Sequence, residues 1–339
     1  MKIHQKIAVI GAGSWGTALA RLLGDKGRVV TLWGHRPEHV TALAGSRENK
    51  AYLPGYFFSD SVAITSSLKE AVDGATMVVM VVPSHVFREV FSTLVPLLEP
   101  GTDIVSATKG IENESLMTMT QLMEEILPVD LLINLGVLSG PSFAKEVADN
   151  TPTAVTVAAR KIDVARSFQE AFSTERFRVY TSTDVIGVEL GGPLKNIVAI
   201  AAGICDGLKY GTNTRAALIT RGLAEITRMG VKMGADPMTF SGLAGLGDLV
   251  LTCTGDLSRN RQVGLMLGRG KTLKDILAEM SMVAEGIKTT RSAWLLATKL
   301  GVDMPILEQI YKVIYENKPC AHAVTDLLAR DLKEELDYS

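Results

Sequence analysis

A glycine motif near the start of the chain constrains its fold more than any other stretch. The apolar run at residues 6–10 predicts a short buried strand, and Gly11, Gly13 and Gly16 follow it in the spacing G-x-G-x-x-G before a helical run. The first glycine permits a tight turn, the second lets backbone approach a pyrophosphate, and the third lets the helix pack closely on the strand. N–H groups at the helix start attract an anion without a basic side chain. We therefore expect a dinucleotide-binding βα unit rather than an ordinary strand–helix turn.

The first half of the chain alternates between strand and helix patterns. Helical patterns such as 84–98 and 115–127 separate apolar, β-branched runs, which favours an α/β fold with a doubly wound, mostly parallel sheet of the Rossmann type. The expected strands are 6–10, 28–33, 62–65, 77–82, 103–107, 132–138, 153–159 and 177–181.

The second half of the chain reads as helical. After residue 184 the strand patterns stop, and helical patterns cover 188–203, 214–233, 273–280, 289–300, 304–315 and 321–332. We therefore predict two domains, a dinucleotide-binding domain at 1–186 and an all-α domain for substrate binding and catalysis at 187–339.

Three loops of the first half follow expected strand ends. They are 82–84, 108–110 and 139–142. Ligands of doubly wound sheets bind outside the carboxyl ends of the strands. We expect these loops to face one crevice.

Composition excludes several classes of protein. The 339 residues are 47% hydrophobic and 21% charged with a net charge of −2, which gives no general affinity for nucleic acid or anionic membranes. The three cysteines are widely spaced without a C-x-x-C pair, and the five histidines lack metal-ligand spacing, so we expect neither disulfides nor a bound metal. No uninterrupted apolar run is long enough to span a bilayer, and residues 1–23 hold the glycine motif rather than a signal peptide. We expect a cytoplasmic protein.

The end of the second expected strand bears on the choice of cofactor. NAD-binding folds of this type place a carboxylate there to hold the adenosine ribose. Here the strand is followed by Gly34, His35 and Arg36. A guanidinium suits a ribose phosphate, which favours NADPH over NADH. Glu38 lies near enough to keep NADH open, and Arg36 on an ordinary surface turn is the alternative.

Lys195 is the most informative charged residue of the second half. It is the only formal charge between Glu189 and Asp206, in a stretch that is apolar on nearly every helical face. A buried lysine is either paired or has a lowered pKa, and both suit proton transfer. A lysine whose head reaches the surface is the alternative.

Two further motifs carry polar groups suited to a small phosphorylated ligand. Asp248 follows a glycine-rich turn and could orient Lys195, or simply cap a helix. Ser258, Arg259 and Asn260 open a helical run and offer a hydroxyl, a guanidinium, an amide and free N–H groups to a phosphate. An N-cap followed by solvated arginines is the alternative.

Taken together and in order, the motifs resemble those of the bacterial NAD(P)-dependent glycerol-3-phosphate dehydrogenase family over nearly the whole chain. The matching motifs are Gly11–Ala18, Thr108–Glu112, Ser139–Ala144, Lys195–Asn196, Gly245–Leu249 and Ser258–Asn260. The resemblance implies interconversion of dihydroxyacetone phosphate and sn-glycerol 3-phosphate, which supplies phospholipid synthesis, with Lys195 as proton donor and acceptor.

The resemblance also implies the other site residues. Substrate contacts fall on Lys109, Gly140, Ser142, Lys195, Asp248, Ser258, Arg259 and Asn260. Cofactor contacts for NADPH or NADH fall on Gly11, Gly13, Ser14, Trp15, Gly16, His35, Arg36, Lys109, Ala144, Arg259, Val283 and Glu285.

Two other hypotheses stay open on the sequence alone. One is a related two-domain reductase of another small hydroxy acid, although such an enzyme gives no reason for the set at 258–260. The other is an NAD(P)H sensor without chemistry, although a sensor needs no buried lysine. Apolar helix faces such as 289–300 would suit a homodimer, but periodicity does not separate core from interface.

Overall fold

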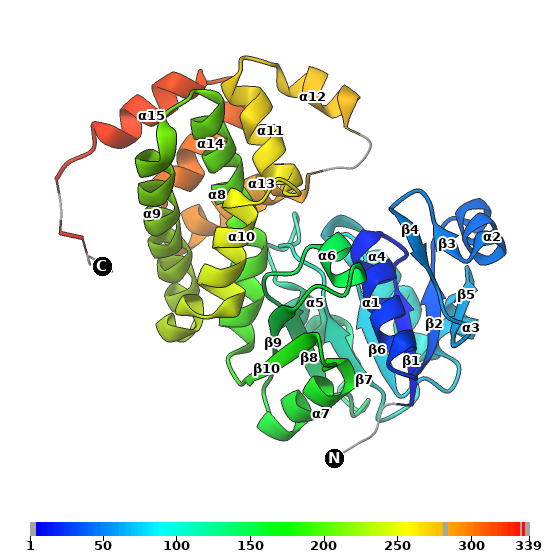
Figure 1. Ribbon diagram of the computed structural model, residues 1–339. Coiled ribbons are helices and arrows are strands. Elements are labelled where there is room, and N and C mark those ends of the chain that lie inside the picture. Colours follow the sequence, from blue (N-terminus) through cyan, green and yellow to red (C-terminus); the bar gives the residue numbers. More distant parts are fainter. Residues whose placement is uncertain (1–4, 281–283, 333, 336–339) are drawn as a thin grey trace. The chain divides into compact units, whose positions relative to one another are not determined.

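The computed structural model describes residues 5–280, 284–332 and 334–335, and it divides into two compact units (Figure 1). The first unit takes residues 1–109 and 117–185, and the second takes 110–116 and 186–339. Segment 110–116 belongs to the second unit because Ile111 is buried in its helical core. The predicted division into independent domains at 186/187 stays a prediction.

An eight-stranded sheet forms the centre of the first unit. Its strands run in the order β10-β9-β8-β7-β6-β1-β2-β5, and neighbours are parallel except for β8 and β9. This confirms the predicted mostly parallel, doubly wound sheet. The strands are β1 Lys6–Ile10, β2 Val29–Trp33, β5 Val62–Thr65, β6 Met77–Met80, β7 Asp103–Ser106, β8 Leu135–Ser139, β9 Thr153–Ala159 and β10 Phe177–Ser182.

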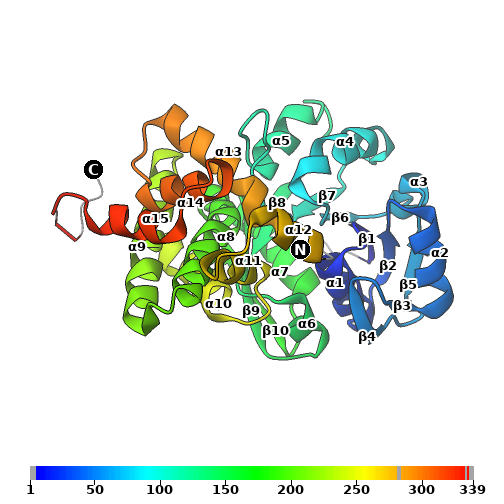
Figure 2. The same ribbon diagram turned by 90° about the horizontal axis from the view of Figure 1, so that it is seen from above.

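Helices cover both faces of this sheet because its strands are apolar on both faces. In β1, Ile7 and Val9 pack in one core cluster with residues of α1 (Ser14–Asp25) and α7 (Ile162–Phe172). Ala8 and Ile10 point the other way and pack with α3 (Leu68–Val72), α4 (Ser84–Leu94) and α5 (Met119–Ile126). Figure 2 shows α4 and α5 on the side of the sheet opposite α1.

Two local features differ from what the sequence predicts. Residues 115–118 are not helical, because Thr118 forms a capping box with Gln121 and so starts α5 at Met119. The hairpin of β3 (Glu48–Asn49) and β4 (Leu53–Phe57) was missed, since Pro54 and Gly55 weaken the strand pattern.

Every regular element in the described part of the second unit is helical, as predicted. Its α-helices are α8 Val185–Gly207, α9 Gly211–Lys232, α10 Asp248–Thr254, α11 Arg259–Gly268, α12 Leu273–Glu279, α13 Glu285–Leu300, α14 Pro305–Tyr315 and α15 Cys320–Leu328. A 3-10 turn at Pro237–Ser241 and a π-helical turn at Leu243–Gly247 precede α10.

Helix α8 forms the centre of the helical core. Its side chains from Gly187 to Cys205 are all buried. Among the described residues it is the one helix long and apolar enough to cross a membrane, yet 89% of its apolar window is buried inside the structure. A core helix meets the same criteria of length and composition.

The apolar stripe of α13 is also core. Thr290, Ala293 and Leu296 are buried within the second unit, and the ring of Trp294 stacks on that of Tyr311 at 4.2 Å between centroids. The suggested use of residues 289–300 as a dimer face is therefore wrong for this stripe.

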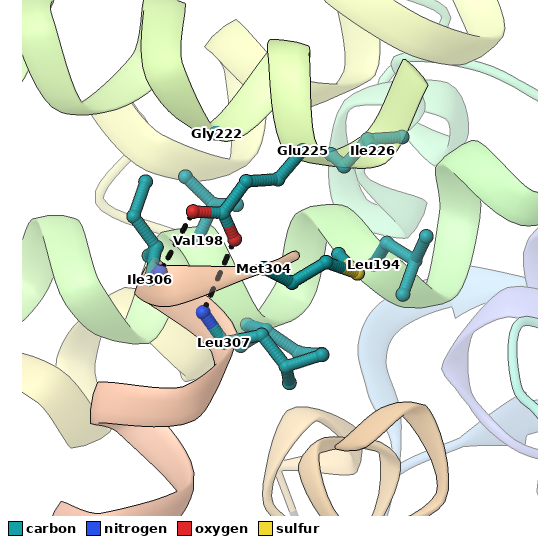
Figure 3. A pocket seen from close by; sticks show the side chains of 9 residues that line it. Leu194, Val198, Gly222, Glu225, Ile226, Met304, Ile306 and Leu307 are labelled. Atoms are coloured by element: carbon teal, nitrogen blue, oxygen red, sulfur yellow. Dashed lines mark hydrogen bonds between the residues drawn. The ribbon is translucent and has the colours of Figure 1, made fainter. Parts of the chain in front are cut away.

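A buried carboxylate links α9 to α14. Glu225 Oε1 accepts a hydrogen bond from Ile306 N at 2.7 Å, and Oε2 accepts one from Leu307 N at 3.2 Å (Figure 3). Burial is the main reason that the pKa of Glu225 rises from 4.5 to about 7, opposed by these two hydrogen bonds and by the charge of Arg228. A cavity of about 10 Å³, the size of one water molecule, lies beside it.

Candidate active site

The glycine loop between β1 and α1 has the geometry expected of a pyrophosphate cradle. Gly11 has φ +129°, and a Cβ there would lie 2.7 Å from the carbonyl oxygen of Val81. A Cβ on Gly16 would lie 1.8 Å from the carbonyl oxygen of Gly11, whereas a Cβ on Gly13 would meet nothing within 4 Å. The first and third glycines are therefore required by the fold, and the second leaves open space where a ligand can approach the backbone.

A buried asparagine holds this loop in place. Asn49 Nδ2 donates hydrogen bonds to the carbonyl oxygen of Ala12 at 3.0 Å and to Thr17 Oγ1 at 2.7 Å. Asn49 is 0% exposed and comes from the β3–β4 hairpin. Sequence reasoning missed it, because a lone asparagine at the end of a two-residue strand carries no motif.

The start of α1 is linked to the loop after β2 through one tyrosine. Ser14 Oγ donates to the carbonyl oxygen of Tyr52 at 2.7 Å, and Arg36 Nη2 donates to Tyr52 Oη at 2.7 Å. His35 and Arg36 are exposed. Trp15 Nε1 is buried and has no hydrogen-bond partner among the described residues. The open Gly13, this donor and the exposed guanidinium of Arg36 fit a dinucleotide.

The other predicted loops of the first unit lie at the same sheet edge, because β1, β6, β7 and β8 are parallel neighbours. Thr108 Oγ1 donates to the carbonyl oxygen of Val82 at 2.8 Å, which joins two of these loops. Gly140 has φ +142°, and Ser142 Oγ donates to its carbonyl oxygen at 3.0 Å. Lys109 is half-buried after β7, and Ala144 opens α6 (Ala144–Ala148).

Lys195 forms a buried polar cluster in the second unit. The exposed fraction of its side chain is 6% and that of Asp248 is 1%. Lys195 Nζ donates to Asp248 Oδ1 at 2.5 Å and to Thr252 Oγ1 at 2.7 Å. Thr252 Oγ1 in turn donates to the carbonyl oxygen of Asp248 at 2.6 Å. The lysine is therefore paired inside the core and does not reach the surface.

Glycine explains how α8 comes this close to the turn before α10. A Cβ on Gly191 would lie 2.1 Å from the carbonyl oxygen of Ala244, so no other residue allows this contact. Lys195 lies one turn after Gly191 on the same face of α8, and Asp248 lies four residues after Ala244. Thr252 follows Asp248 by four residues, and this i, i+4 spacing is the signal that could have identified it.

The start of α11 carries the third set of predicted residues. Ser258 is the N-cap, and its Oγ accepts a hydrogen bond from Arg261 N at 3.2 Å. Arg259 is exposed and Asn260 is half-buried. Asn260 Oδ1 accepts a hydrogen bond from Gly286 N at 3.0 Å in the first turn of α13. The guanidinium of Arg259 and the amide nitrogen of Asn260 are both groups that suit an anion.

Within each unit, the structure brings some of the predicted site residues close together. Glu285 opens α13 beside the Asn260 contact, whereas Val283 lies outside the described residues. Lys195 and Asp248 contact each other directly. Their roles toward substrate and cofactor stay predictions at this point.

A sheet with a dinucleotide loop, followed by a helical unit that buries a lysine–aspartate pair, defines a class of two-unit NAD(P)-dependent oxidoreductases. Residues 6–165 match the family model of the NAD-dependent glycerol-3-phosphate dehydrogenase N-terminus, and residues 184–325 match that of its C-terminus. The chain belongs to the NAD(P)-dependent glycerol-3-phosphate dehydrogenase family.

Comparisons over the full length agree with this assignment. The chain is 59% identical over 331 residues to a glycerol-3-phosphate dehydrogenase (NAD(P)+) of Geobacter sp. strain M21, covering 98% of the chain and 99% of the relative. It is 60% identical over 332 residues to that of Desulfotalea psychrophila, covering 97% and 98%. The crystal structure of glycerol-3-phosphate dehydrogenase from Coxiella burnetii superposes with a TM-score of 0.92 at 43% identity, covering 97% and 99%.

The chain is therefore an oxidoreductase of glycerol 3-phosphate that uses NAD(P)H and NAD(P)+. Among the three hypotheses from the sequence, the comparisons favour the first over a reductase of another hydroxy acid and over a sensor without chemistry.

Proposed function

We propose that Lys195 is the general acid of this dehydrogenase when dihydroxyacetone phosphate is reduced to sn-glycerol 3-phosphate, and the general base in the reverse direction. One observation carries the proposal. The Lys195 ammonium is buried and held between Asp248 Oδ1 and Thr252 Oγ1 at 2.5 and 2.7 Å. A group fixed in this way loses little orientational freedom when it transfers a proton.

The proposed proton transfer follows from the charge that develops during the reaction. The nicotinamide cofactor, when bound, supplies the hydride for the ketone carbon and accepts it in the reverse reaction. As the carbonyl oxygen becomes an alkoxide, Lys195 donates first a hydrogen bond and then a proton to it. Asp248 stabilises the ammonium before the transfer. Acid–base assistance of this kind is worth about 100- to 10,000-fold in rate, and Lys109 adds electrostatic stabilisation of the oxyanion.

The phosphate of the substrate is proposed to bind at the start of α11. Arg259 and Asn260 supply charged and amide donors beside the N-terminal turn that Ser258 caps. Binding energy from the phosphate then orients the ketone. Lys109, the backbone at Gly140, Ser142 and Asp248 complete the proposed substrate contacts.

The cofactor is proposed to bind along the edge of the sheet. The proposed contacts are Gly11, Gly13, Ser14, Trp15, Gly16, His35, Arg36, Lys109, Ala144, Arg259, Val283 and Glu285. The exposed Arg36 at the end of β2, where NAD-specific folds carry a carboxylate, supports a preference for NADPH.

The cellular role is part of the same proposal. We propose that the enzyme works in the cytoplasm as a homodimer and supplies the glycerol backbone of phospholipids. Light scattering after size-exclusion chromatography tests the dimer. Glycerol auxotrophy after deletion of the gene tests the metabolic role.

A steady-state assay tests the proposed reaction directly. Reduction of dihydroxyacetone phosphate is measured with NADPH and NADH side by side, and unphosphorylated dihydroxyacetone serves as the matched substrate. We expect kcat/KM to favour the phosphate ester strongly and NADPH over NADH. Equal efficiency with the two ketones would contradict the phosphate site, and faster reduction with NADH would contradict the role given to Arg36.

A further inference from the structure

Four glycines allow the backbones of helices α8 and α11 to pack in direct contact. A Cβ on Gly203 of α8 would lie 2.0 Å from the carbonyl oxygen of Arg261, and one on Gly264 of α11 would lie 1.9 Å from that of Ile200. One turn further along, Gly207 and Gly268 make the same kind of contact, with a Gly207 Cβ only 2.8 Å from Gly268 Cα. This spacing of small residues lets two helix backbones touch, as it does in close-packed helix pairs.

An ion cluster fastens the first turn of α11 to the end of α8. Arg261 Nε and Nη2 contact Asp206 Oδ2 at 2.9 and 2.7 Å, and Arg261 Nη1 contacts Asp256 Oδ1 at 2.9 Å. The side chains of Arg261 and Asp206 are only 15% and 14% exposed, whereas Asp256 is 98% exposed. Of the two aspartates, Asp206 therefore makes the contact that solvent and salt screen less, and this contact holds the turn.

Asp206 has a second partner that does not belong to α11. Arg215 Nη1 of α9 contacts Asp206 Oδ1 at 3.1 Å, with 26% of the Arg215 side chain exposed. The two arginines share one carboxylate, but only Arg261 connects it to the turn that carries Arg259 and Asn260. Arg215 thus provides a matched control within the same cluster.

Arg261 connects this ion cluster to the proposed phosphate-binding residues. Arg261 is two residues after Arg259, in the first turn of α11, and its N–H is also the group that Ser258 caps. Asp206 lies in the last turn of α8, the helix that carries Lys195. The glycine contacts set the separation of the two helices, and the ion pair sets where the first turn of α11 lies along α8.

We infer that Asp206 and Arg261 are positioning residues that fix the phosphate-binding turn of α11 relative to the helix that carries Lys195. Together they set the distance between the phosphate site and the Lys195 site, and so the distance between phosphate and reacting carbonyl that a substrate must have. The inference rests on the proposed function, since it takes Arg259 and Asn260 as the phosphate ligands. Neither Asp206 nor Arg261 touches the substrate in this account.

Arg261→Met tests the inference because it keeps an unbranched apolar side chain in place of the arginine stem and removes the ion pair. A misplaced ligand turn costs about 10- to 100-fold in rate. We expect kcat/KM for dihydroxyacetone phosphate to fall by that factor, and the inhibition constant of inorganic phosphate to rise with it. The value of kcat/KM for unphosphorylated dihydroxyacetone, measured at saturating NADPH, should stay unchanged, because this ketone carries no phosphate for the turn to bind.

Three further variants separate positioning from loss of structure. Arg215→Met removes the other arginine on Asp206 and should leave the ratio of kcat/KM between the two ketones unchanged. Arg261→Lys keeps one charge for Asp206 and should recover part of the lost ratio. Asp206→Asn keeps the shape of the carboxylate and should reproduce the Arg261→Met effect, which covers the case in which Arg261→Met does not fold.

The results for Arg259 and Arg261 variants separate the positioning inference from the proposed phosphate site on which it rests. If Arg259→Met leaves both kcat/KM for dihydroxyacetone phosphate and inhibition by inorganic phosphate unchanged, the proposed phosphate site is wrong. If Arg259→Met weakens both but Arg261→Met and Asp206→Asn do not, the positioning inference alone is overturned. An equal loss with both ketones would also overturn it, since that result indicates a general structural defect.

Discussion

Removing either charge of the Lys195–Asp248 pair should destabilise the helical unit strongly. The two side chains are 6% and 1% exposed, so the remaining charge would stay inside the core without its counter-ion. Breaking a buried pair of this kind costs about 3–5 kcal/mol, whereas replacing both charges by apolar groups is often close to neutral. We expect Lys195→Met and Asp248→Leu each to lower the free energy of unfolding by that amount.

The double variant turns this expectation into a measurement of the pair itself. Lys195→Met/Asp248→Leu should be more stable than the sum of the two single losses predicts, by about 3 kcal/mol. Urea unfolding of the helical unit can be followed by Trp294 fluorescence when Trp15 and Trp33 are changed to Phe in all four proteins. If the losses of unfolding free energy in the two single variants add up in the double variant, the two charges do not interact as a buried pair. Single losses below about 1 kcal/mol would also contradict a buried pair, because they are typical of exposed ion pairs.

Four other variants test three separate parts of the structure. Gly13→Ala should leave the stability of the apo protein within about 0.5 kcal/mol of wild type and raise the Kd of NADPH at least about tenfold. Gly16→Ala should instead destabilise the first unit itself. Thermal melts measure the stability and calorimetric titration measures the Kd; a destabilised Gly13→Ala or an unaffected Gly16→Ala would contradict these roles. Because burial raises the pKa of Glu225 to about 7 from 4.5, the folded state binds this proton more tightly, and stability should fall by up to about 3 kcal/mol as pH rises from 4.5 through 7. Glu225→Gln should flatten that slope while losing the hydrogen bond from Leu307 N, and an unchanged slope in urea titrations at several pH values would count against this carboxylate. Arg36→Glu should lower kcat/KM with NADPH at least about tenfold and leave that with NADH nearly unchanged; equal losses with both cofactors would remove Arg36 from the discrimination.

The sheet and the helical unit were predictable because their patterns are periodic. The eight strands of the main sheet lie within two or three residues of the predicted ranges, since each is a short apolar run ended by turn residues. The β3–β4 hairpin was not predictable, because its pairing depends on tertiary contacts such as those of Asn49 with Ala12 and Thr17. The parallel pairing of the main sheet was predictable, but the reversal at β9 was not, because no local signal encodes it.

The candidate site shows the same division between local and tertiary signals. The glycine loop and the lone charge of Lys195 are local features, and the resemblance to a family added the other site residues. Thr252 and the Asp206–Arg261 pair depend on which helix faces pack together, and that packing is set by glycines whose partners are distant in sequence. Helical periodicity marks α13 as amphipathic but does not reveal that its apolar stripe faces α14.

The most direct test of the account is the rate of hydride transfer in a single turnover of Lys195→Met, followed by loss of NADPH absorbance with saturating dihydroxyacetone phosphate. We expect a rate about 100- to 10,000-fold below wild type, with the Kd of NADPH unchanged. A rate within a few-fold of wild type in a variant that binds NADPH normally would show that another group supplies the proton.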